Sequence, residues 1–192
     1  MSADRPVLLV VIASTRPIAA GRAVGAWVAA RAEVDERFTL DVVDLRELAL
    51  PFLDEPRHPK LRAYEHDHTH AWSARVAGAD AFVFVTPEYN HSFTAPLKNA
   101  LDYLNAEWAH KPVGIVSYGG LSGGSRAVTA LEPVLSNLAL LTVQANVELA
   151  WVAEHITDDR FEATDRHDRA LDAQFDAIAR YLPASTALRS GV

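Results

Sequence analysis

Two patterns of apolar residues take turns along this chain, one typical of strands and the other of helices. Mostly apolar runs occupy residues 7–13, 81–86 and 113–118, and such runs are typical of strands buried on both faces of a sheet. Residues 38–45 alternate between apolar and polar side chains and predict a more peripheral strand. Residues 141–147 predict a fifth strand.

The segments between these runs carry apolar residues at helical spacing. They predict helices over residues 23–28, 61–76, 97–104, 127–138 and 171–182. Pro133 falls inside the fourth of these patterns, where it should kink the helix or remove one backbone hydrogen bond.

Strands that alternate with helices predict an α/β protein whose parallel sheet is covered by helices on both faces. Five such units fit a three-layer, flavodoxin-like arrangement with a five-stranded parallel sheet in the order 2-1-3-4-5. The chain has 192 residues, 49% of them hydrophobic, which is enough to bury one core. No repeat or linker divides it, so we expect a single domain over residues 1–192.

Composition and charge disfavour several functional classes. The chain has no cysteine, which excludes disulfides, thiolate nucleophiles and thiolate metal sites. Its formal net charge of −7 disfavours a nucleic-acid partner, because a phosphate backbone needs a basic surface. The longest apolar run is far too short to span a bilayer, and it lacks the flanks of a signal peptide. We therefore expect a cytoplasmic protein with no nucleic-acid or membrane partner.

In a sheet of this order, ligands bind beyond the carboxyl ends of the strands, at the switch point between strands one and three. The loop after the first strand offers Ser14 and Arg16 just before a helix, and hydroxyl, guanidinium and free amide groups suit a phosphate. Arg22, in the first helical turn, either contacts that phosphate or points to solvent. GxxxxGK[ST] and GxGxxG patterns do not follow this strand, which disfavours a nucleoside triphosphate or a dinucleotide.

The loop after the third strand presents Pro87, Glu88, Tyr89 and Asn90. Backbone amides, a carboxamide and an aromatic face suit a flat heteroaromatic ring with donors and acceptors along its edge. The alternative is an ordinary turn, in which proline and asparagine are common. That alternative explains Pro87 and Asn90 but not the whole set at the end of a central strand.

The fourth strand ends at Ser117 and Tyr118, and Gly119 and Gly120 begin a glycine-rich loop. Glycines allow a close approach between backbone and ligand, although they also suit a flexible connector. Tyr118 either lines a ring pocket or belongs to the core. We take these four residues, with those of the other two loops, as candidate cofactor-binding residues.

On these residues the chain resembles the NADPH-dependent FMN reductase family of flavodoxin-like proteins. The resemblance is carried by residues 14–17, by residues 86–92 followed by 97–102, and by residues 119–120 followed by 123–127. It implies bound FMN, NADPH or NADH as electron donor, and a homodimer or tetramer with the flavin near the subunit interface. It also implies that the first loop holds the phosphate and the other two loops hold the ring and the ribityl chain.

The resemblance implies an FMN-dependent NAD(P)H oxidoreductase. Such an enzyme passes hydride from nicotinamide to flavin, and then electrons to a quinone, azo compound, free flavin or similar small acceptor. Because the flavin does the chemistry, we expect no catalytic side chain. Two alternatives stay open: a flavodoxin-type electron carrier without fast NADPH turnover, and a cofactor-free interaction module.

His66 and His70 could together suggest a metal site. These histidines lie four positions apart and could share a helical face, as zinc ligands do. The HExxH motif is missing and no third ligand is identifiable, so we expect no metal.

Overall fold

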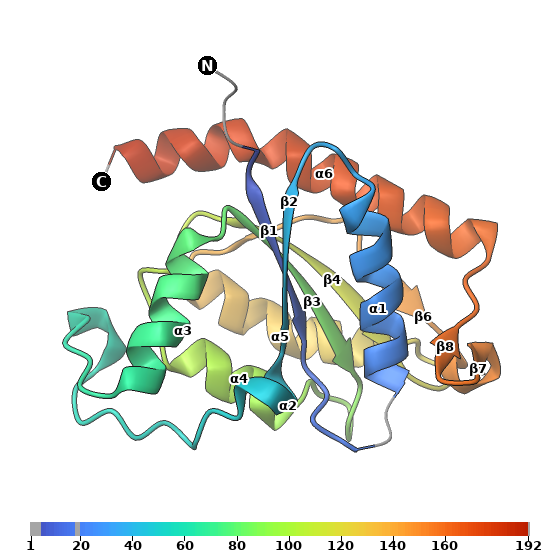
Figure 1. Ribbon diagram of the computed structural model, residues 1–192, viewed down its shortest axis with the longest axis horizontal. Helices are drawn as coiled ribbons and strands as arrows, with labels where there is room; N and C mark the ends of the chain where they lie inside the picture. Colours follow the sequence, from blue (N-terminus) through green and yellow to red (C-terminus); the bar gives the residue numbers. More distant parts are fainter. Residues whose placement is uncertain (1–4, 18–19, 192) are drawn as a thin grey trace.

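The computed structural model describes residues 5–17 and 20–191, and its main elements surround one parallel sheet (Figure 1). The sheet has the order β2-β1-β3-β4-β5, with β6 also paired to β4, and these pairings are all parallel. The predicted flavodoxin-like α/β fold and its strand order are therefore confirmed. The strands are β1 (Val7–Ile12), β2 (Thr39–Asp44), β3 (Ala81–Pro87), β4 (Pro112–Tyr118), β5 (Leu141–Thr142) and β6 (Val147–Leu149).

The prediction of one fifth strand over residues 141–147 is wrong, because two short strands share that position. β5 pairs with the start of β4, and β6 pairs with its end. Between them, the Nε2 of Gln174 donates to the carbonyl of Ile115 at 2.9 Å and to that of Ala145 at 2.7 Å. Gly114 makes room for this amide, since a Cβ there would lie 2.5 Å from Gln174 Cδ. A buried side chain therefore replaces sheet hydrogen bonds where the strand is interrupted.

Helices cover both faces of the sheet, as Figure 1 shows. Side chains alternate along a strand, so Phe82 and Phe84 of β3 point into one core while Val83 and Val85 point into the other. All four are completely buried. The helices are α1 (Ala20–Glu33) and α6 (Asp165–Ser190) over the valine face, and α3 (Asp67–Gly78), α4 (Ala95–Asp102) and α5 (Ser125–Asn137) over the phenylalanine face.

The predicted helix over residues 61–76 is wrong in its first half. A short 3-10 helix, η1 (Pro59–Leu61), ends at Arg62 in the left-handed conformation, and α3 begins only after His66. The carboxylate of Glu55 accepts the backbone N–H groups of Glu65 and His66 at 2.8 and 3.1 Å. These bonds hold the segment before α3 in a non-helical path. A contact with a residue ten positions earlier leaves no trace in apolar spacing.

The other helices overlap their predicted ranges but differ at their ends, and α4 has the predicted length two residues earlier in the chain. α5 accommodates Pro133 in its interior, and α6 runs for 26 residues, far beyond the predicted 171–182. Among the described helices, none combines the length and the apolar character that crossing a membrane requires. The elements not predicted are α2 (Leu45–Leu48), η2 (Val152–His155), β7 (Ile156–Thr157) and β8 (Arg160–Phe161).

Candidate functional site

The three loops selected from the sequence leave the sheet side by side. The parallel register pairs Thr86 with Ser117 at the ends of β3 and β4. Thr94, the N-cap of α4, donates from Oγ1 to the carbonyl of Ala13 at 3.1 Å, which ties the loop after β3 to the loop after β1. We call this shared surface the carboxyl edge and define it as residues 13–17, 20–22, 88–94 and 118–124.

The loop after β1 combines one buried hydroxyl with exposed cationic side chains. Ser14 is buried, and its Oγ lies 3.3 Å from the Oη of Tyr89 in the loop after β3. Arg16 is exposed. Arg22, also exposed, lies in the first turn of α1 and donates a hydrogen bond to the carbonyl of Pro17. The Arg22 guanidinium therefore folds back over the loop instead of extending into solvent.

A further arginine, Arg46, was missed in the sequence. Its Nη1 lies 3.4 Å from the carbonyl of Pro17, the same carbonyl that Arg22 contacts. The signal was available, since β2 neighbours β1 and the loop after β2 opens on the same edge. Asp44 is occupied as the N-cap of α2, where it accepts the N–H of Arg46 at 2.8 Å. The first turn of α1 has no acidic side chain, so its free N–H groups and positive dipole end suit an anion.

The loop after β3 forms a two-residue hairpin turn. Tyr89 and Ser92 exchange backbone hydrogen bonds of 2.8 and 3.0 Å. The two residues between them, Asn90 and His91, both have positive φ, 51° and 64°. This is the backbone of a type I′ turn, which asparagine adopts more readily than most residues. The structure thus gives Asn90 a conformational role in the turn in addition to its predicted contact with a ring.

Glu88 joins the loops after β3 and β4. Its carboxylate accepts from the Nε of Arg126 at 2.6 Å and from the Oγ of Ser122 at 2.9 Å. Burial favours the neutral acid, but the hydrogen bonds from Arg126 and Ser122 outweigh it and hold the pKa of Glu88 below its usual value. The Glu88 side chain is therefore committed to the protein, and it fixes the spacing of the two loops.

The loop after β4 is shaped by hydrogen bonds to its own backbone. Ser117 is buried, and its Oγ donates to the carbonyl of Gly123 at 2.9 Å. Gly124 has φ of 91°, and a Cβ there would lie 2.7 Å from Ser117 Cβ. Gly119 donates to Leu149 O at 3.2 Å and accepts from the N–H of Val152 at 3.1 Å. These contacts make the loop an ordered element of the edge.

Gly120 and Tyr118 differ in their exposure to solvent. Gly120 is exposed, and a Cβ added there would meet nothing within 4 Å. The space over its Cα is therefore open to a ligand, while its carbonyl accepts from the N–H groups of Gly123 and Trp151. Tyr118 is only 5% exposed, and its ring belongs to the core beneath α1 and α6. Pro87, the partner of Tyr118 in the β3–β4 register, is also buried.

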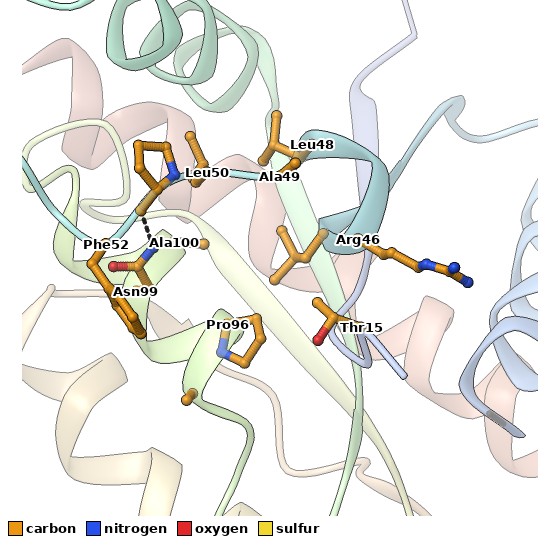
Figure 2. A pocket seen from close by; sticks show the side chains of 12 residues that line it. Thr15, Arg46, Leu48, Ala49, Leu50, Phe52, Pro96, Asn99 and Ala100 are labelled. Atoms are coloured by element: carbon orange, nitrogen blue, oxygen red, sulfur yellow. Dashed lines mark hydrogen bonds between the residues drawn. The ribbon is translucent and has the colours of Figure 1, made fainter. Parts of the chain in front are cut away.

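A pocket of about 480 Å³ lies beside the first loop, between α2 with its following segment and the N-terminal end of α4 (Figure 2). Thr15, Arg46 and Asn99 are the polar residues in a mostly apolar lining. Asn99 is occupied, because its Nδ2 donates to Pro51 O at 2.7 Å, the dashed line of Figure 2. Phe52 at the rim is 86% exposed. The described residues that line this pocket include none from the hairpin turn or the glycine loop. Both of those loops have exposed residues at their tips, Asn90 and Gly120 among them.

The histidines considered as metal ligands are occupied in other contacts. His66 precedes α3 as its N-cap residue, and its ring stacks on that of His68 with centroids 5.2 Å apart. His68 Nε2 lies 3.0 Å from a carboxylate oxygen of Asp54, and His70 packs edge-on against Tyr64. Within residues 5–17 and 20–191, no three histidine, aspartate or glutamate side chains are grouped as metal ligands would be.

Comparison with known proteins places this surface in a family context. Residues 6–154 match the family model described as NADPH-dependent FMN reductase. An NAD(P)H-dependent FMN reductase of Schizosaccharomyces pombe is 44% identical over 124 residues, which are 64% of this chain and 62% of that protein. The NADPH:quinone oxidoreductase of Arabidopsis thaliana is 47% identical over 67 residues, 33% of this chain and 34% of that protein. The chain thus matches less than two thirds of the length of these two relatives.

Solved structures show the same fold. The flavoenzyme FerB of Paracoccus denitrificans, an NAD(P)H:(acceptor) oxidoreductase, aligns with a TM-score of 0.73 at 20% identity, over 94% of this chain and 98% of that one. All three loops of the carboxyl edge lie within the residues that match the family model, and that match extends over more than half of the chain. The chain therefore belongs to the NADPH-dependent FMN reductase family.

Proposed function

We propose that this protein is an FMN-dependent NAD(P)H oxidoreductase. Its carboxyl edge holds FMN, accepts electrons from NADPH or NADH, and passes them to a small acceptor such as a quinone, an azo compound or free flavin. The observation that carries this proposal is the convergence of three different loops in a chain of this family. A cationic helix N-terminus, a polar left-handed turn and a glycine with open space over its Cα meet at one edge.

The residues of the carboxyl edge fit the two ends of FMN. The N-terminus of α1, with Ser14, Arg16 and Arg22, provides hydroxyl, guanidinium and amide donors for a phosphate. The turn at Tyr89 and Asn90 provides polar groups for the edge of a flat ring. At Gly119 and Gly120 the ring can rest directly on the backbone, because the space above Gly120 is open.

The chain's own contribution is to position the cofactor. FMN, when bound, supplies the two-electron chemistry. The loops after β3 and β4 are called the ring-side loops, because they would hold the flavin ring. The hydrogen bond between Glu88 and Arg126 keeps these two loops at a fixed distance. The contact between Ser14 and Tyr89 joins the phosphate side to the ring side. No described side chain needs to act as an acid, base or nucleophile for this role.

A second copy of the chain completes the proposed site. The ring-side loops have exposed residues at their tips, and four large apolar side chains near this edge or along the segment after α2 are well exposed. We therefore propose a homodimer, or a tetramer built from it, which a sedimentation-equilibrium mass would establish. A cytoplasmic location remains our expectation. The exposed apolar side chains are Phe52 (86%), Leu61 (67%), Leu121 (79%) and Trp151 (52%).

The test is the visible absorption spectrum of the FMN-reconstituted protein before and after anaerobic addition of NADPH. Flavin bands that persist in the protein after gel filtration and bleach rapidly with NADPH are the expected result. Retained bands that do not bleach with NADPH or NADH would indicate an electron carrier instead. A protein that retains no flavin would contradict the proposal and favour the interaction module.

A further inference from the structure

Tyr118 carries a buried hydroxyl group that has no partner. The residue is 5% exposed, and its Oη forms no hydrogen bond within residues 5–17 and 20–191. A buried, unpaired hydroxyl destabilises a folded protein, and almost all such groups are paired in native structures. A tyrosine at this position, where phenylalanine would fill the same space, therefore indicates a ligand that pairs with the hydroxyl.

The Tyr118 hydroxyl is aimed at the first turn of α1. A Cβ built on Gly21 would lie 2.3 Å from Tyr118 Oη and 3.0 Å from Ser14 Cβ. The helix can therefore rest on this hydroxyl only because residue 21 is glycine. α1 is 14 residues long, and the N–H groups of its first turn have no partner within the helix. The hydroxyl, Ser14 and the N-terminus of the helix therefore lie next to one another.

The electrostatic surroundings of Tyr118 favour an anion. Burial raises the pKa of Tyr118, the neighbouring Ser14 hydroxyl and then the Arg16 guanidinium oppose that rise, and Tyr89 and Asp44 add to it. Arg22 and Arg46 both reach the neighbouring carbonyl of Pro17. The acidic group in this region, Asp44, is held by α2. Burial raises the pKa of the Tyr118 phenol, so the group keeps its proton and is able to donate a hydrogen bond.

We propose that Tyr118 binds the phosphate of FMN, donating a hydrogen bond from Oη to the phosphomonoester at the N-terminus of α1. This inference rests on the proposed binding of FMN, and it assigns Tyr118 to the phosphate end of the ligand instead of the ring. Gly21 is the residue that makes the contact possible. The pairing removes the destabilising effect of the buried hydroxyl in the loaded protein.

The test compares FMN with riboflavin, which lacks the phosphate. Apoprotein is titrated with each flavin while flavin fluorescence is followed, for the wild type and for Tyr118→Phe. The variant should bind FMN about tenfold more weakly, the loss expected for one hydrogen bond to a charged group, and riboflavin equally well. The apo variant should melt at the same temperature as the wild type or higher, because the unpaired hydroxyl is gone.

Tyr103→Phe is the matched control. Tyr103 is also completely buried, but its hydroxyl donates to Asp54 at 2.9 Å, away from the carboxyl edge. This variant should lower the melting temperature and leave the ratio of FMN to riboflavin affinity unchanged. Inorganic phosphate alone should raise the melting temperature of the wild-type apoprotein more than that of Tyr118→Phe.

Gly21→Ala provides a second, independent approach, because its methyl group would displace the Tyr118 hydroxyl. It should weaken FMN binding in the wild type and have much less effect in the Tyr118→Phe background. An unchanged FMN affinity in Tyr118→Phe, or equal losses for FMN and riboflavin, would overturn the assignment while leaving the proposed function intact. A wild-type protein that binds neither flavin would overturn both.

Discussion

The two edges of the sheet use polar residues in opposite ways. At the amino edge, defined here by Asp80, Lys111 and Arg189, each charged side chain has at least one hydrogen-bond partner, although the Nε of Arg189 has none. Asp80 accepts the N–H of Val7 at 2.9 Å and a guanidinium hydrogen of Arg189 at 3.0 Å. Lys111 is buried, and its Nζ donates to the carbonyl of Val76, near the C-terminal end of α3, at 2.7 Å.

The carboxyl edge has the reverse character. Tyr118 keeps an unpaired hydroxyl, and Asn90 and His91 hold left-handed backbone conformations. Gly120 leaves the space over its Cα open. Both edges belong to the same strands, so the difference reflects function and not fold. The amino edge stabilises the protein, whereas the carboxyl edge keeps strain and unused hydrogen-bonding capacity for a ligand.

Substitutions of Gly124 and Gly120, two glycines of the loop after β4, should have different effects: the first should lower stability and the second should mainly weaken FMN binding. Gly124→Ala forces a side chain into left-handed backbone and within 2.7 Å of Ser117, so we expect a loss of about 3 kcal/mol in the free energy of unfolding. Gly120→Ala adds a methyl group in open space, so we expect a change of less than about 0.5 kcal/mol but weaker FMN binding. Urea denaturation of the two apoproteins and FMN titration measure both effects. Equal losses of stability in the two variants would contradict the assignment of a structural role to Gly124 and a binding role to Gly120.

Lys111 should give the amino edge a distinctive pH dependence. Burial lowers its pKa from 10.5 to about 8. Between those values the unfolded chain holds a proton that the folded chain has lost, so the free energy of unfolding should rise with pH, by about 1 kcal/mol between pH 8 and 9. As the pH falls below 8, the folded lysine also takes up its proton and this slope fades.

Denaturation of the wild type and of Lys111→Met at several pH values tests that expectation. The variant should lack the rise and bind FMN as the wild type does, because the residue lies at the opposite edge. Lys98→Met, which changes a half-exposed lysine on α4, is the control that should keep the rise. Parallel curves for the wild type and Lys111→Met would refute the assignment.

A stability effect as small as that of Gly120→Ala is expected at Asn90. Glycine tolerates its positive φ, so Asn90→Gly should change the free energy of unfolding by less than about 0.5 kcal/mol while lowering FMN affinity several-fold. Alanine is a poorer probe, because left-handed backbone costs it about 1–2 kcal/mol. His91→Gly changes an equivalent backbone position and should leave FMN affinity within about twofold. A large stability loss in Asn90→Gly would mark the carboxamide as structural.

Much of the fold was predictable because its strands are buried on both faces. Continuous apolar runs located β1, β3 and β4, and the alternation of strands and helices predicted the sheet order that the structure has. The failures occur where a distant side chain determines the backbone. Glu55 keeps the segment before α3 from becoming helical, and Gln174 fills the break between β5 and β6.

The candidate site likewise has a part that the sequence predicts and a part that it does not. Its loops were predictable, since parallel strands that end at one edge must bring their following loops together. The directions of its side chains were not. Glu88 turns to Arg126, 38 positions along the chain, and Tyr118 turns beneath Gly21 instead of facing solvent.

The sequence by itself determined the layers, the strand order, the three loops and the family, because each depends on local residue patterns and short motifs. Only the tertiary structure decided which polar groups are consumed by the protein and which remain for a ligand. Pairing depends on distances between residues far apart in the chain, and those distances are set when the two cores pack against the sheet. The unpaired hydroxyl of Tyr118 is a product of that packing.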